Sequence, residues 1–211
     1  MDIYSRLLEN FGLQNWWPAE KPFEVMVGAI LTQSANWTNV EKAIHNLKTA
    51  DLINPAALRA VSLEELGHVI HSCGYYNMKA RKLKALADWF GLNFSDNLED
   101  VKRVNTAFLR DSLLSINGVG EETADSILLY ACDKPVFVID AYTRKIVDRL
   151  GFRVRGIKYA DYQRFFTINL KPNVFLYNEF HALLVVLGKT HCKKLPICQN
   201  CCLSAVCEKK W

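Results

Sequence analysis

The sequence predicts an all-α protein. Apolar residues recur at three- and four-residue spacing through most of the chain, and several of these segments follow residues that commonly start helices. Strands of consequence, internal repeats and low-complexity segments are not evident in the sequence. With 211 residues, half of them apolar, the chain can form one large or two small domains with a real core.

A series of helices is expected in the first half. Residues 2–11 predict a short amphipathic helix, and residues 22–33, apolar nearly all round, predict a buried one. The next helix starts have local signals: Thr38-x-x-Glu41 (a capping box), Asn54-Pro55 and Ser62-x-x-Glu65. Residues 78–91 predict a long basic amphipathic helix. Its charge run is either a solvated face or a contact for a phosphate backbone, and consists of Lys79, Arg81, Lys82 and Lys84.

Two helical patterns are joined by a glycine turn, Gly118-Val119-Gly120, and the second starts at Glu121. Glycine at both ends of the turn permits positive φ and the close approach of another backbone. Free N–H groups at a helix start suit a phosphate, although a plain turn between two helices is the simpler interpretation.

A short apolar segment, residues 135–139, leads to Asp140, the first residue of another helical pattern. The simplest role for Asp140 is an N-cap, worth roughly 1 kcal/mol. A capping carboxylate is also held rigid and ionised, so this role is compatible with catalysis. Residues 159–170 and 174–190 predict two further helices.

Cysteines are unevenly distributed. Cys73 and Cys132 are scattered and expected to be buried, whereas the last twenty residues contain the run Cys192-x5-Cys198-x2-Cys201-x5-Cys207, with Cys202 in addition. In a reducing compartment such a run favours a metal or iron–sulfur site over disulfides. Four thiolates suit zinc as well as an iron–sulfur cluster.

The formal net charge of +4 permits nucleic-acid binding but does not require it. We found no secretory leader pattern and no apolar run near the roughly 20 residues of a membrane span. We therefore expect a cytoplasmic protein, nucleoid-associated if bacterial, without a membrane partner.

The motif L-x-x-x-G-V-G-x-x-T-A, followed by an Asp that opens a helix, resembles the helix-hairpin-helix, Gly/Pro-rich-loop-Asp superfamily of DNA glycosylases. The resemblance covers nearly the whole chain and is closest to the endonuclease III-like branch. It implies two helical domains with a DNA-binding cleft between them. These are a six-helix domain (21–132) with the hairpin at about 105–132, a second domain (1–20 and 133–190) with the catalytic Asp, and a cluster loop (191–211).

The resemblance also implies a 4Fe–4S cluster, with zinc as the alternative. The family pattern is C-x6-C-x2-C-x5-C, and this chain has one residue fewer in the first gap. The implied ligands are Cys192, Cys198, Cys201 and Cys207. The expected role of the cluster is structural: it pins a loop whose lysines lie near phosphates.

The chemistry implied is base excision: a damaged base is flipped out of duplex DNA and its N-glycosidic bond is broken. Asp140 aligns with the catalytic Asp, which stabilises the oxocarbenium-like sugar and orients or deprotonates water. Bifunctional members carry a Lys at the position of Glu122, and a glutamate cannot form a Schiff base. We therefore expect a monofunctional glycosylase with little or no AP-lyase activity; the alternative is that Lys79 or Lys189 substitutes.

The segment Trp16-Trp17-Pro18, with Gln33-x-x-x-Trp37, resembles the base pocket of 3-methyladenine DNA glycosylases. An N3-alkylated adenine is cationic and leaves readily, so an aromatic slot can select it by cation–π attraction of roughly 0.5–2 kcal/mol per ring. From the residues alone, one tryptophan packs and the other is on the surface. The implied base pocket is Trp16, Trp17, Pro18 and Trp37, and the implied DNA contacts are Gln33, Tyr75, Gly118, Val119, Gly120 and Thr123.

Gln33 and Tyr75 match the family positions that fill the gap left by the flipped base and wedge the duplex. Tyr75 is otherwise simply an exposed loop aromatic. Two alternatives for the function remain. One is an endonuclease III-like glycosylase acting on uracil or thymine mismatches or oxidised pyrimidines, with or without lyase activity. The other is a non-catalytic helix-hairpin-helix DNA-binding module. The expected partner is duplex DNA with a damaged base, bound by a monomer.

Overall fold

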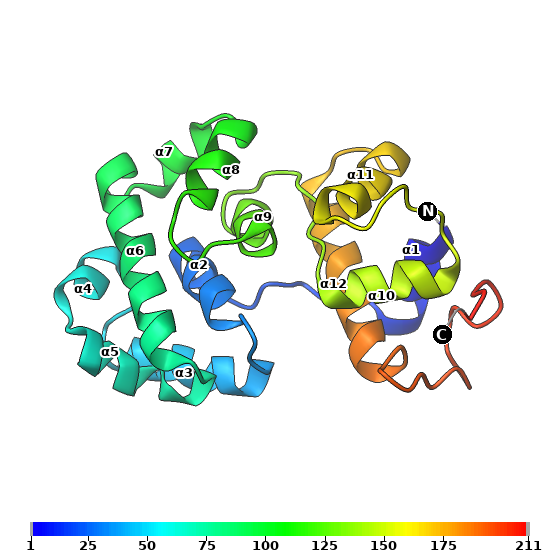
Figure 1. Ribbon diagram of the computed structural model, residues 1–211, viewed down its shortest axis with the longest axis horizontal. Coiled ribbons are helices and arrows are strands. Elements are labelled where there is room, and N and C mark those ends of the chain that lie inside the picture. Colours follow the sequence, from blue (N-terminus) through cyan, green and yellow to red (C-terminus); the bar gives the residue numbers. More distant parts are fainter. Residues whose placement is uncertain (1, 210–211) are drawn as a thin grey trace. The chain divides into compact units, whose positions relative to one another are not determined.

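The computed structural model describes residues 2–209, and over this range it is all-helical, without a strand (Figure 1). The predicted all-α class is therefore confirmed. Two compact units form: the residues up to Pro18 together with those from Pro135 onward, and Ala19–Lys134. The domain boundaries expected from the sequence were 20/21 and 132/133, two residues from each observed division. Within residues 2–209, no helix has the length and apolar character of a membrane span.

The unit Ala19–Lys134 is built around α2 (Pro22–Leu31), which starts with Pro in its first turn and is buried from Phe23 to Leu31. Helices α3, α6 and α9 pack on α2, and α4 and α5 pack on α6. The bounds of the other elements are α3 (Trp37–Thr49), α4 (Pro55–Ala60), α5 (Leu63–Val69), the 3₁₀ turn η1 (His71–Cys73), α6 (Tyr76–Phe94), α7 (Leu98–Arg103), α8 (Thr106–Leu114) and α9 (Glu121–Tyr130).

Two sequence predictions for this unit need correction. Its described residues form eight α-helices, not six, because short helices such as α7 each need only one cap and one turn. Helix α3 starts after Asn36, whose side chain accepts from Asn39 N at 2.9 Å, and not at the Thr38 capping box. The earlier start places Trp37 in the helix, where its Nε1 donates to Glu41 Oε1 at 2.7 Å.

In the basic run on α6, Arg81 is exposed, whereas Lys79 and Lys84 bind carbonyl groups of the same unit. Lys79 is 2% exposed, and its Nζ donates to the carbonyls of Leu31 (2.9 Å) and Cys73 (2.8 Å). Burial lowers the pKa of Lys79. Lys84 Nζ donates to the carbonyl of Arg59. These lysines satisfy carbonyl groups at the ends of neighbouring helices, an arrangement that stabilises helix C-termini.

The other unit contains α1 (Asp2–Phe11), α10 (Ala141–Leu150), α11 (Tyr159–Asn169) and α12 (Val174–Thr190). Helix α12 is its centre: α1 and α10 both pack on it, and ten of its residues are buried. An aromatic core adjoins it, in which Phe137 stacks on Phe166 at 3.9 Å between ring centroids and meets Tyr177 and Phe180 edge-on. The chain before α10 is therefore anchored in the core through Phe137.

Candidate functional site

The hairpin lies between α8 and α9. Gly118 has φ +85°, Val119 is buried at 6% exposure, and Gly120 caps α9 with φ −96°. Gln33, at the end of α2, clamps this turn: its Nε2 donates to Gly118 O at 3.1 Å and to Thr123 Oγ1 at 2.9 Å. Its Oε1 accepts from Lys82 Nζ at 2.6 Å. The structure thus brings together five of the six predicted DNA contacts and shows that Gln33 holds the turn, which the sequence did not indicate.

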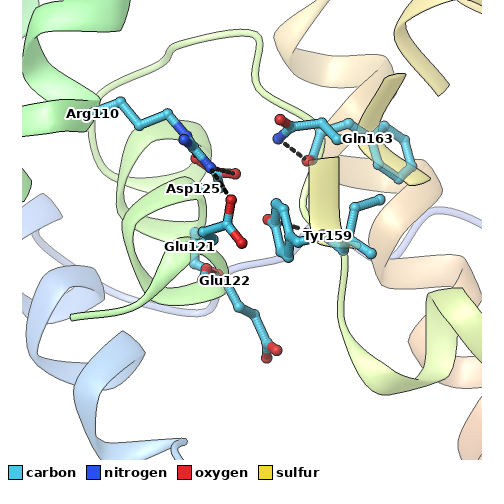
Figure 2. A network of polar contacts seen from close by, with 9 residues as sticks. Arg110, Glu121, Glu122, Asp125, Tyr159 and Gln163 are labelled. Carbon is cyan, nitrogen blue, oxygen red and sulfur yellow. Dashed lines mark hydrogen bonds and ion pairs between the residues drawn. The ribbon is translucent and has the colours of Figure 1, made fainter. Parts of the chain in front are cut away.

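A buried ion pair fixes α8 against α9. Asp125 is fully buried and accepts two hydrogen bonds from Arg110, from Nε to Oδ1 at 2.7 Å and from Nη2 to Oδ2 at 3.2 Å (Figure 2). The same Nη2 lies 3.4 Å from Glu121 Oε1. The forked geometry matches both carboxylate oxygens of Asp125. Glu122, one residue along α9 from Glu121, is exposed. It occupies the first turn of α9, where a carboxylate is favoured by the helix dipole.

Asp140 is the N-cap of α10. Its Oδ1 accepts from Thr143 N at 2.7 Å, and its Oδ2 lies 3.9 Å from Nε2 of His181 on α12. The Asp140 side chain is 13% exposed and that of His181 is 9% exposed. Burial lowers the pKa of His181, and the nearby charge of Asp140 opposes this shift. The carboxylate therefore stands beside a neutral imidazole at pH 7 and is fixed by its cap.

The segment that delivers Asp140 is held from α11. Tyr159 Oη accepts from Ile139 N at 3.2 Å, and Gln163 Nε2 donates to Phe137 O at 2.9 Å (Figure 2). Ile139 is buried at 1% exposure. Backbone groups on both sides of Val138 are thus satisfied, as buried polar groups must be. The strand-like composition of residues 135–139 serves this buried, extended connection and forms no sheet.

Trp16 and Trp17 lie in the loop after α1, and both are half-buried, whereas Pro18 is exposed. The two rings meet edge-on with centroids 6.1 Å apart, and the peptide bond between them is cis. The expectation that one tryptophan packs and the other is on the surface is not what the structure shows. The ammonium of Lys189, near the end of α12, lies 5.5 Å from the ring centroid of Trp16.

The remaining predicted DNA contact, Tyr75, and the remaining predicted pocket residue, Trp37, belong to the unit Ala19–Lys134. Tyr75 is 69% exposed in the left-handed region (φ +47°) just before α6, and follows Gly74 at φ +62°. Trp37, half-buried, opens α3. The unit up to Pro18 and from Pro135 thus contains Trp16, Trp17, Pro18 and Asp140, while the other contains Trp37, Gln33, Tyr75 and the hairpin.

The four cysteines of the predicted cluster, which are Cys192, Cys198, Cys201 and Cys207, line one cavity together with Arg149 and Ile146 of α10. Arg149 Nη1 lies 3.3 Å from Cys192 Sγ, and Cys207 Sγ lies 3.3 Å from Arg149 O. In residues 2–209 no three His, Cys, Asp or Glu side chains are arranged to hold a single metal ion. Four cysteine side chains around one cavity are a donor set that suits either an iron–sulfur cluster or a zinc ion. The end of the expected loop, residues 210–211, lies outside the described range.

Comparisons with known proteins agree with these features. Residues 27–168 match the family model described as HhH-GPD superfamily base excision DNA repair protein. A provisionally named DNA repair glycosylase of Methanocaldococcus jannaschii is 46% identical, over 99% of this chain and 95% of that protein. Endonuclease III of Sulfolobus acidocaldarius is 29% identical, over 88% of this chain and 81% of that protein.

Solved structures show the same fold. The H. pylori 3-methyladenine DNA glycosylase, bound to 1,N6-ethenoadenine, has a TM-score of 0.77 and 30% identity, and the match covers 89% of this chain and 96% of that one. Endonuclease III in a non-covalent complex with DNA has a TM-score of 0.83 and 23% identity, over 99% and 93% of the two chains. The chain therefore belongs to the HhH-GPD superfamily of base excision DNA repair proteins. Within that superfamily it is an endonuclease III-like DNA glycosylase, as its motifs predicted.

Proposed function

We propose that this protein is a monofunctional glycosylase that removes an alkylated purine, such as 3-methyladenine, from duplex DNA. The observation that most directly supports this proposal is that one helix, α12, contacts both the capped carboxylate and the aromatic pair. His181 of this helix faces Asp140, and Lys189 lies over Trp16. The solved glycosylase at 30% identity, named for 3-methyladenine and bound to 1,N6-ethenoadenine, supports the same substrate class.

In this reaction Asp140 needs no proton of its own. Its carboxylate stabilises the positive charge that develops on the sugar as the C1′–N bond breaks, and it accepts the proton that water loses as its oxygen bonds to C1′. The bond's electron pair goes to the base, which neutralises an alkylated cation, so no strong general acid is required. The N-cap bond to Thr143 and the wall formed by His181 keep the carboxylate in one orientation.

The aromatic pair supports recognition of the base. Trp16 and Trp17 offer two half-buried π faces of large area. Because Lys189 already places a positive charge at Trp16, a cationic base gains less from this ring than from a free one. Trp17 then carries more of the selection, and a neutral alkylated purine is also accommodated. Trp37 and Pro18 as further walls of the pocket remain part of the proposal.

The absence of lyase activity follows from the side chains available. Glu122 occupies the position at which bifunctional relatives have the amine nucleophile, and a carboxylate forms no Schiff base. Lys79, one of two possible substitutes, is 2% exposed with its Nζ bonded to two carbonyls. Lys189 is the remaining amine to test. A separate observation favours DNA as the partner, since the clamped hairpin presents the start of α9.

Under the same proposal the four cysteines hold a 4Fe–4S cluster. When bound, the cluster supplies a structural link that closes the loop after α12 against α10. Arg149 prepares that link, because its guanidinium also donates to Lys193 O at 2.6 Å and Lys194 O at 3.1 Å. The loop is thereby fixed with both lysine backbones turned toward Arg149, and the lysine charges remain available to phosphates.

The test is base release from methylated duplex DNA, with the products separated by chromatography and the strands checked for cleavage. We expect free 3-methyladenine with intact strands, a loss of at least about 100-fold in rate for Asp140→Asn with unchanged DNA binding, and no covalent trapping by borohydride. Release of uracil, thymine or an oxidised pyrimidine instead would discard the alkylated-purine assignment. Equal activity of Asp140→Asn would remove Asp140 from the mechanism, and trapping that Lys189→Met abolishes would establish a lyase.

A further inference from the structure

Glu179 of α12 is a buried carboxylate that the reaction itself does not use. Its side chain is 2% exposed, and its two oxygens accept from consecutive backbone N–H groups: Oε2 from Gln14 at 2.7 Å and Oε1 from Asn15 at 2.7 Å. These donors immediately precede Trp16. We propose that Glu179 is a positioning residue: its carboxylate holds the Trp16–Trp17 loop and thereby sets which base is accepted. This inference rests on the proposed function, because it assigns that loop to base selection.

The chemistry of the contact requires an anion. Both partners are donors, so each carboxylate oxygen must accept, and successive N–H groups that converge on one point favour a negative charge. Hydrogen bonds to a charged group are shorter and stronger than neutral ones, consistent with both distances. A glutamine here would turn its NH₂ group toward one N–H donor. It would therefore lose one of the two bonds and leave two donors facing each other.

The loop has few other anchors before Trp16. Gly12, Leu13 and Asn15 are exposed, and Gly12 and Asn15 have φ of +70° and +50°. The side chain of Gln14 closes the end of α1, with Nε2 donating to Phe11 O at 3.0 Å and Gly12 O at 3.1 Å. The end of α1 is thus satisfied without Glu179. The carboxylate serves the segment that follows the helix, which is the segment that carries the aromatic pair.

The placement of Glu179 on α12 is what gives this anchor a functional meaning. Two residues further along the same helix, His181 faces Asp140, and near its end Lys189 lies over Trp16. Glu179 also lies close to Tyr4 of α1, whose pKa is raised by burial and by the charge of Glu179. Helix α12 therefore sets the register of the aromatic loop relative to the catalytic carboxylate. A loosened loop would bind the base less selectively without altering Asp140.

The experiment compares the unsubstituted protein with Glu179→Gln, with Glu179→Asp and with Asp148→Asn as a matched control. Asp148 is an exposed acid of the same unit that accepts from Tyr162 Oη at 2.7 Å, and its substitution removes the same charge. Proteins labelled with 5-fluorotryptophan are examined by fluorine NMR, with Trp16→Phe and Trp17→Phe assigning two signals. Single-turnover kinetics on methylated and undamaged duplexes give the rate at saturation and the half-saturating enzyme concentration separately.

For Glu179→Gln we expect shifted or broadened Trp16 and Trp17 signals. The half-saturating concentration should rise at least about tenfold, since one charge-assisted hydrogen bond is lost. The saturated rate should stay within about threefold, and the preference for the alkylated base should fall. Glu179→Asp, which retains the charge but withdraws it by one methylene, should fold even if Glu179→Gln does not and should shift the same signals. Asp148→Asn should change none of these quantities.

Unchanged Trp16 and Trp17 signals and unchanged selectivity in the Glu179 variants would overturn the inference. So would an equal loss in Asp148→Asn, which would indicate a general effect of charge. Failure of the proposed function gives a different result: the unsubstituted protein then releases no alkylated base, whatever the fluorine spectra show. In that case shifted signals together with altered selectivity for the base that is released would support the positioning role of Glu179.

Discussion

At the residue scale, Asp140 combines a structural role as a helix cap with the catalytic role proposed for it, and His181 lies beside it. Asp140 caps α10 through Oδ1 and presents Oδ2 to a buried imidazole at 3.9 Å. A protonated His181 would attract Asp140 and compete with a cationic sugar for the same carboxylate. Burial, which lowers the pKa of His181, removes that competition near neutral pH. A neutral imidazole so close to the Asp140 carboxylate is therefore compatible with the glycosidic cleavage proposed for this site.

This pair predicts a pH dependence of stability. A lowered pKa in the folded state means that the unfolded chain, with His near pH 6.5, binds a proton that the native protein does not. The contribution of His181 is fully present above about pH 6.5 and is lost on acidification, by at most about 1.4 kcal/mol per pH unit. Urea unfolding of the parent protein, His181→Gln and the exposed control His45→Gln at several pH values measures this slope.

His181→Gln should flatten the dependence of unfolding free energy on pH between about 6.5 and 5. His45→Gln, the substitution of an exposed histidine, should leave this dependence as in the parent protein. The same slope in all three proteins would contradict the assignment to His181. Comparing slopes, and not absolute stabilities, separates this effect from any packing change that glutamine introduces.

At the scale of elements, the hairpin depends on two glycines for different reasons. Gly118 has φ +85°, and a Cβ there would lie 2.4 Å from Lys82 Cε, so the Lys82 side chain that binds Gln33 would have to move. Gly120 has φ −96°, and a Cβ there meets nothing within 4 Å. Gly118 is thus required by the fold of the turn, whereas Gly120 leaves open space at the start of α9.

The prediction is a split between the two alanine substitutions. Gly118→Ala should lower the free energy of unfolding by about 1–2 kcal/mol, the cost of a left-handed conformation for a residue with a Cβ. Gly120→Ala should change it by less than about 0.5 kcal/mol. It should still weaken binding to undamaged duplex DNA, because its methyl group stands where a phosphate approaches the N–H groups. Denaturation and fluorescence anisotropy measure the two effects, and equal stabilities for both variants would refute it.

Elements also show which parts of the structure could be predicted from the sequence. Helices α4, α5 and α10 each begin at a capping residue whose side chain accepts a hydrogen bond from the backbone N–H three residues later. All three capping residues, Asn54, Ser62 and Asp140, were identified from the sequence. The start of α3 was placed wrongly because Asn36 and Thr38 are both good caps, and the spacing of the residues alone does not decide between them. Local chemistry therefore predicts where helices begin when a single candidate cap is present.

Contacts between distant parts of the chain were not predictable in this way. Lys79 is a polar residue in a basic helix, and its burial depends on the carbonyl of Leu31, 48 positions away. Glu179 lies 165 positions from Gln14, and no spacing in the sequence connects them. A weak signal was present in both cases, because each residue is a charged side chain on an otherwise apolar face of its helix. Such a residue indicates a buried partner but does not identify it.

At the scale of the whole molecule, the unit Ala19–Lys134 is inserted between two segments of the chain that together form the other unit. Residues up to Pro18 and from Pro135 onward fold together, so the first and last helices share one core around α12 (Figure 1). The cysteine loop belongs to this unit and is attached to α10 through Arg149. A cluster bound there stabilises the unit that carries Asp140, and its contribution to the unit Ala19–Lys134 is expected to be small.

Removal of the cluster should therefore affect the two units unequally. Cys198→Ala deletes one proposed ligand, whereas Cys202→Ala deletes the extra cysteine, which is the matched control. Native-state hydrogen exchange should show faster exchange in residues 191–209 and the end of α10 for Cys198→Ala alone, with α2 and α9 unchanged.

Metal analysis of the purified protein should find about four irons per chain in the control. A result of one zinc per chain would indicate a mononuclear zinc site instead of a cluster. An unchanged iron content in Cys198→Ala would exclude that cysteine as a ligand. Faster exchange in α2 and α9 as well would show that the cluster supports the whole chain, because loss of a stabilising group accelerates exchange only in the segments that unfold with it.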